Sequence, residues 1–302
     1  MSGETYCNII DVCECLIRHF TQFTSYGIKR EFVHGQDGPI TEGLAIKPRW
    51  LFRGQAKAYD TLRPLIYRKY PPLSTWQERQ FFRIGDDSLL MPHPHYCEDL
   101  ERDFYFSCIK AAEIISGVSA RFPDFPSAVD GHALCQHYGL PTHFLDFSED
   151  VWVSAFFACH TYLRDAFSPC KEGIGVVYIL EIDQVPKRDI HEIGLQPLPR
   201  PSAQRGWLLR VPPETHLLGH PAIKAIHFRH SESASSLVGE RFTGGVSLVP
   251  KDEVSEFFEA QLRPRSVTSK SVHAYLERVP DDHRPRVRSS IERLFSDSVT
   301  IA

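Results

Sequence analysis

The sequence predicts an α+β protein, because helix-type and strand-type patterns occupy separate stretches of the chain. Apolar residues recur at helical spacing over residues 8–24 and 98–119. The run over 173–182, which is rich in Val and Ile, predicts a buried strand, and two shorter runs over 207–211 and 223–228 predict two more. The composition, 42% hydrophobic and 24% charged residues, is that of a globular chain. Its 302 residues can bury the core of one large domain or of two small ones.

The first elements follow from local patterns near the N-terminus. Residues 8–24 predict an amphipathic helix, and the Gly-rich polar stretch up to Pro48 predicts a loop with room for one short strand. The apolar run Trp50–Phe52 predicts a strand that ends at Gly54. Further helices are predicted over 76–90, 98–119, 129–138, 149–163, 251–262, 269–278 and 286–296.

One domain boundary is suggested, near Pro264. We predict a main domain over residues 1–262, with its core at about 45–262 and an N-terminal helix and loop at 8–48. Residues 263–302 are predicted to form a basic helical extension. Acidic residues interrupt its Arg and Lys residues, which favours a solvated helical surface over a nucleic-acid patch.

Cysteine usage and the lack of a targeting segment predict a cytoplasmic protein. Eight cysteines are too sparse for a disulfide scaffold, and several, such as Cys135 and Cys159, lie within apolar patterns. No apolar run approaches the roughly 20 residues that span a bilayer, so we expect no membrane partner. The start of the chain lacks the basic and apolar regions of a secretory signal. A net charge of −4 does not favour nucleic-acid binding by the molecule as a whole.

Arg53 is the first residue that points to chemistry. A guanidinium at the end of an apolar strand is costly to desolvate unless it meets a carboxylate or a phosphate. Gly54, which follows, lets a backbone or a ligand approach closely. An internal salt bridge explains Arg53 as well as a ligand does, so both interpretations stay open.

The second candidate segment is Gln136–Thr142. It places an amide, an imidazole and a phenol side by side before a Gly-Leu-Pro bend. His137 titrates near neutral pH in its unperturbed form, and the ring of Tyr138 is suited to stacking on a base or a nicotinamide. The alternative is that both side chains cap and fill the core beneath the turn.

Two further polar segments lie next to predicted elements. Asp146 and Ser148 come just before the helix predicted over 149–163, for which Ser148 is the expected N-cap. Arg200 and Gln204 lie in a polar stretch that leads into the strand at 207–211 and also fits a surface loop. We predict no metal site, because the spacing in His93-Pro-His95-Tyr-Cys97 fits no common zinc pattern.

Three segments, in this order, resemble the FRG domain, a family named for its Phe-Arg-Gly signature. The segments are Trp50–Gln55 with Pro64 and Arg68, Gln136–Phe147 with Ala155–Ala158, and Arg200–Trp207. The resemblance covers about residues 8–262 and identifies the main domain as an FRG domain. His143 and Phe147 stand where the family often has Arg and Trp.

The FRG pattern is in turn similar to a distant version of the ADP-ribosyltransferase plan. That resemblance implies a split, mostly antiparallel sheet with packed helices. It also implies NAD as a substrate whose N-glycosidic bond to nicotinamide is cleaved, by an ADP-ribosyltransferase or an NAD glycohydrolase. Arg53 would hold the pyrophosphate or the ribose, and Tyr138 or Phe147 would stack on nicotinamide. The other ligand-binding residues implied are Gly54, Gln55, Gln136, Thr142, Ser148 and Arg200.

The catalytic residues implied are Asp146, His137 and Gln204, with Gln204 bonded to a ribose hydroxyl. The catalytic Glu of the transferase plan falls on Gly206, which has no side chain to replace it. Either another acid substitutes, with Asp146 the first candidate and Glu240 the second, or the pocket binds without this chemistry.

Two alternatives to an enzyme therefore stay open. One is a binding module for a nucleotide, a phosphate-bearing ligand or a protein partner, which has kept the pocket and lost the catalytic Glu. The other is a nucleic-acid-associated protein that uses the basic extension. The sequence does not distinguish a protein acceptor from a nucleic-acid acceptor, and it leaves the oligomeric state open.

Overall fold

The structure is a computed structural model that divides into two compact units. The first unit holds residues 1–62, 145–210 and 216–250, and the second holds 63–144, 211–215 and 251–302. The structure describes residues 5–20, 23–31, 41–68, 82–84, 89–91, 98–121, 131–163, 166–193, 199–211, 217–251, 253–262 and 267–295.

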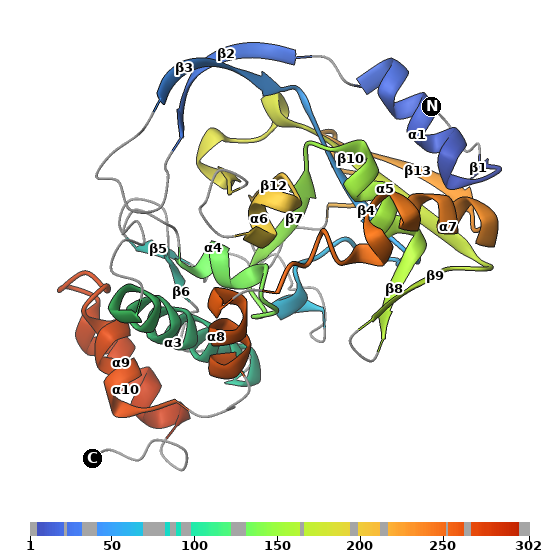
Figure 1. The fold of residues 1–302 in the computed structure, drawn as a ribbon. Coiled ribbons are helices and arrows are strands. Elements are labelled where there is room, and N and C mark those ends of the chain that lie inside the picture. Colours follow the sequence, from blue (N-terminus) through green and yellow to red (C-terminus); the bar gives the residue numbers. More distant parts are fainter. Residues whose placement is uncertain are drawn as a thin grey trace. The chain divides into compact units, whose positions relative to one another are not determined.

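The first unit is built on a seven-stranded sheet with the order β1-β13-β10-β4-β7-β12-β11 (Figure 1). The strands are β1 (Thr5–Tyr6), β4 (Trp50–Gln55), β7 (Phe144–Ser148), β10 (Ile174–Glu181), β11 (Ile190–Glu192), β12 (Gly206–Arg210) and β13 (Ile223–Arg229). β4 pairs antiparallel with β10 and β7, while β1 runs parallel to β13. The predicted α+β class is confirmed. The split sheet of the ADP-ribosyltransferase plan remains a prediction.

Helices α1 (Ile9–Phe20), α5 (Val151–Cys159) and α7 (Glu232–Arg241) pack together beside the sheet, with α5 directly against β4 (Figure 1). The apolar positions of α1 recur at helical spacing and are buried, as the sequence predicts. They join the inward side chains of α5, β4 and β10 in one hydrophobic core. The short helix α6 (Pro199–Ala203) and the 3₁₀ turns η2 (Ile182–Gln184), η3 (Lys187–Asp189) and η4 (Thr243–Gly245) complete the unit.

Two hairpins of the first unit correct the sequence prediction. Residues 27–48, predicted as a loop with room for one short strand, contain most of strand β2 (Phe23–Glu31) and all of its antiparallel partner β3 (Thr41–Pro48). Their alternating apolar residues are a strand signal. The helix predicted over 149–163 ends at Cys159, and β8 (His160–Leu163) pairs with β9 (Ala166–Pro169). The β-branched and aromatic residues after Cys159 favour a strand over a continued helix.

The second unit is mainly helical. Its elements are η1 (Leu65–Tyr67), β5 (Phe82–Ile84), β6 (Leu89–Met91), α3 (Glu98–Arg121), α4 (Gly131–Gln136), α8 (Glu253–Leu262), α9 (Ser269–Leu276) and α10 (Arg284–Leu294). β5 and β6 form an antiparallel hairpin where a helix over 76–90 was predicted. Periodicity does not separate helix from strand in such short apolar runs.

Helices α9 and α10 confirm the helical character predicted for the C-terminal residues. Both pack against α3 (Figure 1), and they bury Tyr275, Leu276, Val287 and Ile291 in the core of the second unit. The basic residue Arg293 donates to Glu101 at 2.7 Å. In the part of the chain that the structure describes, no helix is long and apolar enough to cross a membrane.

Candidate functional site

Strand β4 carries the first candidate residues and has two different faces. A Cβ added to Gly54 would lie 1.8 Å from the Ser154 carbonyl oxygen and 2.5 Å from the Ala158 nitrogen, so the backbone of α5 lies directly against this glycine. Because side chains alternate along a strand, Arg53 and Gln55 project from the face away from α5. Helix α5 therefore occupies the space next to Gly54.

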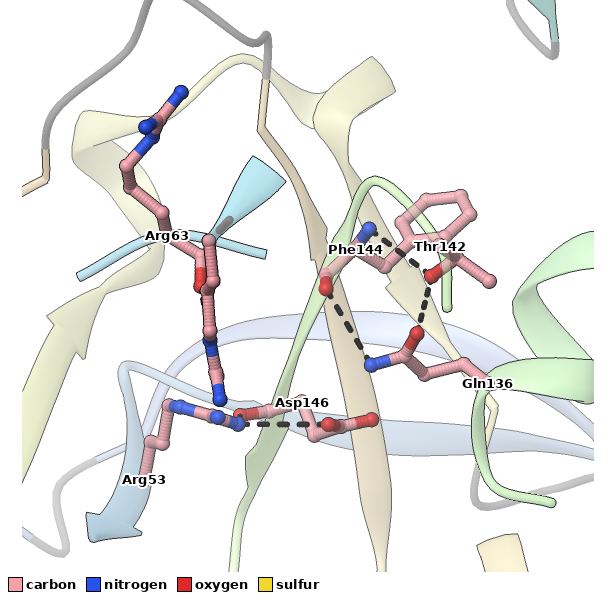
Figure 2. Close-up of polar contacts among 7 residues, drawn as sticks. Arg53, Arg63, Gln136, Thr142, Phe144 and Asp146 are labelled. Carbon is pink, nitrogen blue, oxygen red and sulfur yellow. Dashed lines mark hydrogen bonds and ion pairs between the residues drawn. The ribbon is translucent and has the colours of Figure 1, made fainter. Parts of the chain in front are cut away.

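Arg53 of β4 and Asp146 of β7 form a charged pair in the first unit (Figure 2). Nη1 of Arg53 donates to the main-chain carbonyl of Asp146 at 2.8 Å and lies 3.5 Å from its carboxylate Oδ2. The Arg53 side chain is 13% exposed and that of Asp146 is 37% exposed. The shorter bond therefore goes to the main chain, and the Asp146 side chain is partly exposed although its Oδ1 is shielded from solvent.

Two residues border Arg53 on the same face of the sheet. Tyr178 of β10 lies directly opposite Arg53 in the antiparallel register, and Gln55 lies opposite Val176. Burial raises the pKa of Tyr178, and the positive charge of Arg53 opposes that rise. Sequence reasoning missed Tyr178, because only the register of β10 against β4 places it here.

On the face of β4 that carries Arg53, one atom of Arg53 and one of Gln55 have no hydrogen-bond partner within the described part of the chain. These atoms are Nε of Arg53 and Oε1 of Gln55, and both are shielded from solvent. Gln55 as a whole is 9% exposed. A buried acceptor without a donor is unfavourable, and such groups in a folded protein need an explanation.

The end of β7 leads straight into α5. The helix is capped by Asp150, whose Oδ1 accepts from the Trp152 amide at 2.7 Å, and not by Ser148 as predicted. Ser148 instead accepts from the Asp150 amide at 3.0 Å, which shifts the helix start by two residues. Phe147 is buried.

Hydrogen bonds hold the segment 204–207 against the junction between β7 and α5. The Ser148 hydroxyl donates to the Gln204 carbonyl at 2.7 Å, and the Glu149 amide donates to the Arg205 carbonyl at 3.3 Å. Arg205 has a φ of 46°, a left-handed conformation that is uncommon for a residue with a side chain. The Gln204 amide donates to the Leu248 carbonyl at 2.9 Å, so this side chain ties two segments of the unit together.

Arg200 and Gly206 are the two remaining candidate positions near this segment. Arg200 lies on α6 and is buried. Gly206 begins β12, where its carbonyl accepts from the Ile193 amide at 3.0 Å. It has no carboxylate to place at a ligand. Catalysis by the first unit would therefore depend on an acid elsewhere, such as Asp146.

The turn Gln136–Thr142 belongs to the second unit and is held by its own polar side chains (Figure 2). The Thr142 hydroxyl donates to Oε1 of Gln136 and accepts from the Phe144 amide at 3.2 Å. Gln136 donates in turn to the Phe144 carbonyl at 3.4 Å. Gly139 has a φ of 93°, which a glycine adopts without strain, and it ends the helical turn as predicted.

The two aromatic residues of this turn face the interior. The ring centroid of Tyr138 lies 4.3 Å from that of Phe258 on α8, and Tyr138 is 4% exposed. His137 is half-buried, and its Nε2 is shielded from solvent. This environment favours a core-filling role for Tyr138 over stacking on a ligand.

The structure thus brings Arg53, Gln55 and Asp146 together in the first unit. The hydrogen bond from the Ser148 hydroxyl to the Gln204 carbonyl lies in the same unit. The predicted residues Gln136, His137, Tyr138 and Thr142 lie in the second unit. In the described ranges no group of three or more potential metal ligands occurs. The sequence His93-Pro-His95-Tyr-Cys97 falls outside those ranges.

Comparison with known proteins supports the family resemblance over part of its predicted range. The model of the FRG domain matches residues 48–166, which hold the first two motifs. No curated protein and no solved structure matches the chain. The segment Arg200–Trp207 lies outside the match, so its assignment to the family pattern remains a prediction. Over residues 48–166, this chain is an FRG domain.

Proposed function

We propose that this FRG-domain protein binds NAD at Arg53 and cleaves its bond to nicotinamide, with Asp146 as the acidic group. The observation that supports the proposal is the Arg53–Asp146 pair. The largely buried Arg53 side chain of the central strand β4 lies next to the Asp146 side chain, which is 37% exposed. Such a pair can offer a cation to the phosphate groups of NAD and a carboxylate to the ribose next to them.

Each residue has a distinct part in the proposed reaction. Arg53 holds the pyrophosphate through charge-assisted hydrogen bonds while the Asp146 carbonyl fixes its orientation. The bond between the ribose C1′ and the nicotinamide nitrogen breaks, and its electron pair leaves with neutral nicotinamide. The Asp146 carboxylate stabilises the positive charge that develops on the ribose. Water or an acceptor nucleophile then bonds to C1′ and releases one proton.

Binding without cleavage is the second candidate function. Two observations favour it: Gly206 supplies no carboxylate, and the Gln204 amide is engaged with the Leu248 carbonyl. Losing a transition-state electrostatic group typically costs about 10²–10³ in rate. A chain that retained Arg53 and lost this chemistry would still recognise a nucleotide or another phosphate-bearing ligand.

Release of nicotinamide from NAD by the full-length chain tests the first candidate. We expect release by the wild type, loss of release in Arg53→Ala and in Asp146→Asn, and normal release in Arg49→Ala. The Arg49 variant is a matched control, because it removes an arginine paired with Glu181 at 2.7 Å. Release by folded Asp146→Asn at the wild-type rate would exclude Asp146. Binding of NAD without release would support the second candidate.

A further inference from the structure

We infer that Oε1 of Gln55 accepts a hydrogen bond from a ligand group next to the anion held by Arg53. The site would then bind a ribose joined to a phosphate. The inference rests on the proposed function, and it names the chemical class that this face of β4 selects. Gln55 would be a specificity-determining residue. Arg53 alone would accept any accessible anion.

The geometry of β4 places the two groups in register. Arg53 and Gln55 are two residues apart on one face of the strand, which separates their Cα atoms by about 6.5 Å. A sugar hydroxyl and a phosphate on the same ribose lie within the reach of two side chains at this spacing. Tyr178, opposite Arg53, borders the same face.

The hydrogen-bonding capacity of the two residues points to a ligand with both an acceptor and a donor. Nη1 of Arg53 is used by the Asp146 carbonyl at 2.8 Å. Nε of Arg53, a donor, and Oε1 of Gln55, an acceptor, have no partner among the described residues. A phosphate oxygen would satisfy the donor, but only a hydroxyl or an N–H group would satisfy the acceptor.

The other two glutamines of the motifs provide the contrast. The amide of Gln136 donates to the Phe144 carbonyl, and that of Gln204 donates to the Leu248 carbonyl. The exposed fraction of Gln55 is only 9%, yet its Oε1 accepts from no donor among the described residues. A buried acceptor of this kind needs an explanation, and a hydrogen-bond donor on a bound ligand would supply one.

Calorimetric titration of the full-length chain with ADP-ribose and with inorganic pyrophosphate tests the inference. Both probes offer a pyrophosphate to Arg53, but only ADP-ribose carries ribose hydroxyls. In Gln55→Met we expect affinity for ADP-ribose to fall about three- to tenfold, the value of one neutral hydrogen bond, with no change for pyrophosphate. Arg53→Ala should weaken both probes. Leu51→Met, an apolar exchange on the same face of β4, should weaken neither.

A second readout needs no ligand. Replacing an unpartnered buried amide by an apolar side chain of similar length should leave thermal stability unchanged or raise it. A Gln55→Met chain that is less stable than wild type, or that binds both probes as wild type does, would overturn the inference. So would a wild type that binds neither probe.

These outcomes are separable from failure of the proposed reaction. Selective loss of ADP-ribose binding in Gln55→Met, without nicotinamide release by the wild type, would keep the inference and reject cleavage. Nicotinamide release by the wild type, with no selectivity at Gln55, would keep cleavage and reject the inference.

Discussion

The strand Trp50–Gln55 and the turn Gln136–Thr142 are both rich in polar side chains, but they use them differently. In the turn, Gln136 and Thr142 bond to each other and to the main chain of Phe144. In the strand, Oε1 of Gln55 is buried and has no partner in the described residues. The turn thus uses its amide to hold its own shape, whereas we propose that the strand uses the amide of Gln55 to bind a ligand.

The same comparison applies within β4. Phe52 belongs to the hydrophobic core and Gly54 lies against α5, so this face holds the fold together. The opposite face carries Arg53 and Gln55, the two residues that we propose contact the ligand. Substitutions on the two faces should therefore separate stability from binding.

The largest effect is expected for Gly54→Ala. The added methyl group would lie 1.8 Å from the Ser154 carbonyl oxygen, which belongs to rigid helix backbone. Overpacking of this kind costs about 3 kcal/mol or more in the free energy of unfolding. Denaturant unfolding followed by Trp fluorescence measures it, because Trp50, Trp152 and Trp207 lie in the first unit. Wild-type stability would show that α5 does not lie against Gly54.

The next effect compares two matched exchanges, Gln136→Met and Gln55→Met. The first breaks the bonds to Thr142 and to the Phe144 carbonyl and should cost about 1–3 kcal/mol. The second should cost nothing in the ligand-free chain. Thermal unfolding followed by circular dichroism compares them directly. Equal losses in the two variants would remove the distinction between turn and strand.

A smaller effect is expected for Gln204→Met. This exchange removes the hydrogen bond from Gln204 Nε2 to the Leu248 carbonyl, which is 2.9 Å long. The loss should be about 0.5–1.5 kcal/mol, the net value of one hydrogen bond. Trp fluorescence during denaturant unfolding measures it. If the stability is retained and ADP-ribose binding is lost, Gln204 contacts the ligand and its bond to the Leu248 carbonyl is not its main role.

The smallest effect is expected in the pH dependence of stability caused by His160, the residue that follows α5. Burial lowers the pKa of His160, although the hydrogen bond of Nδ1 to the Phe156 carbonyl opposes the shift. The unfolded chain then binds this proton more readily, so stability should be full above pH about 6.5 and fall as the pH drops through the lowered pKa. His160→Gln should flatten this dependence in denaturant unfolding between pH 5 and 7. An identical slope would contradict the assignment.

Much of the fold was predictable because local patterns decide it. The strands β4, β10, β12 and β13 and the helices α1, α3, α8, α9 and α10 lie close to their predicted ranges. Each has a run of apolar residues at one clear period. The elements missed or misjudged, such as β8, β9 and α7, are short or weakly amphipathic. Their structure depends on packing that a linear pattern does not record.

The sequence identifies residues of the candidate site, but it does not show what each of them contacts. The sequence indicates Arg53 and Asp146, and the structure pairs them. It does not indicate that Tyr178 lies opposite Arg53, because strand register is a long-range property. Nor does it distinguish Gln55 from Gln204, since only tertiary contacts show which amide already has a partner.

Binding of NAD to the full-length wild-type chain, compared with Arg53→Ala and Arg49→Ala by calorimetry, tests the central claim most directly. That claim is that the Arg53 face of β4 is a ligand-binding face. We predict that Arg53→Ala weakens binding by about 10- to 100-fold, the value of a charge-assisted bond, and that Arg49→Ala binds as wild type does. Wild-type affinity in folded Arg53→Ala, or no binding by the wild type, would contradict it.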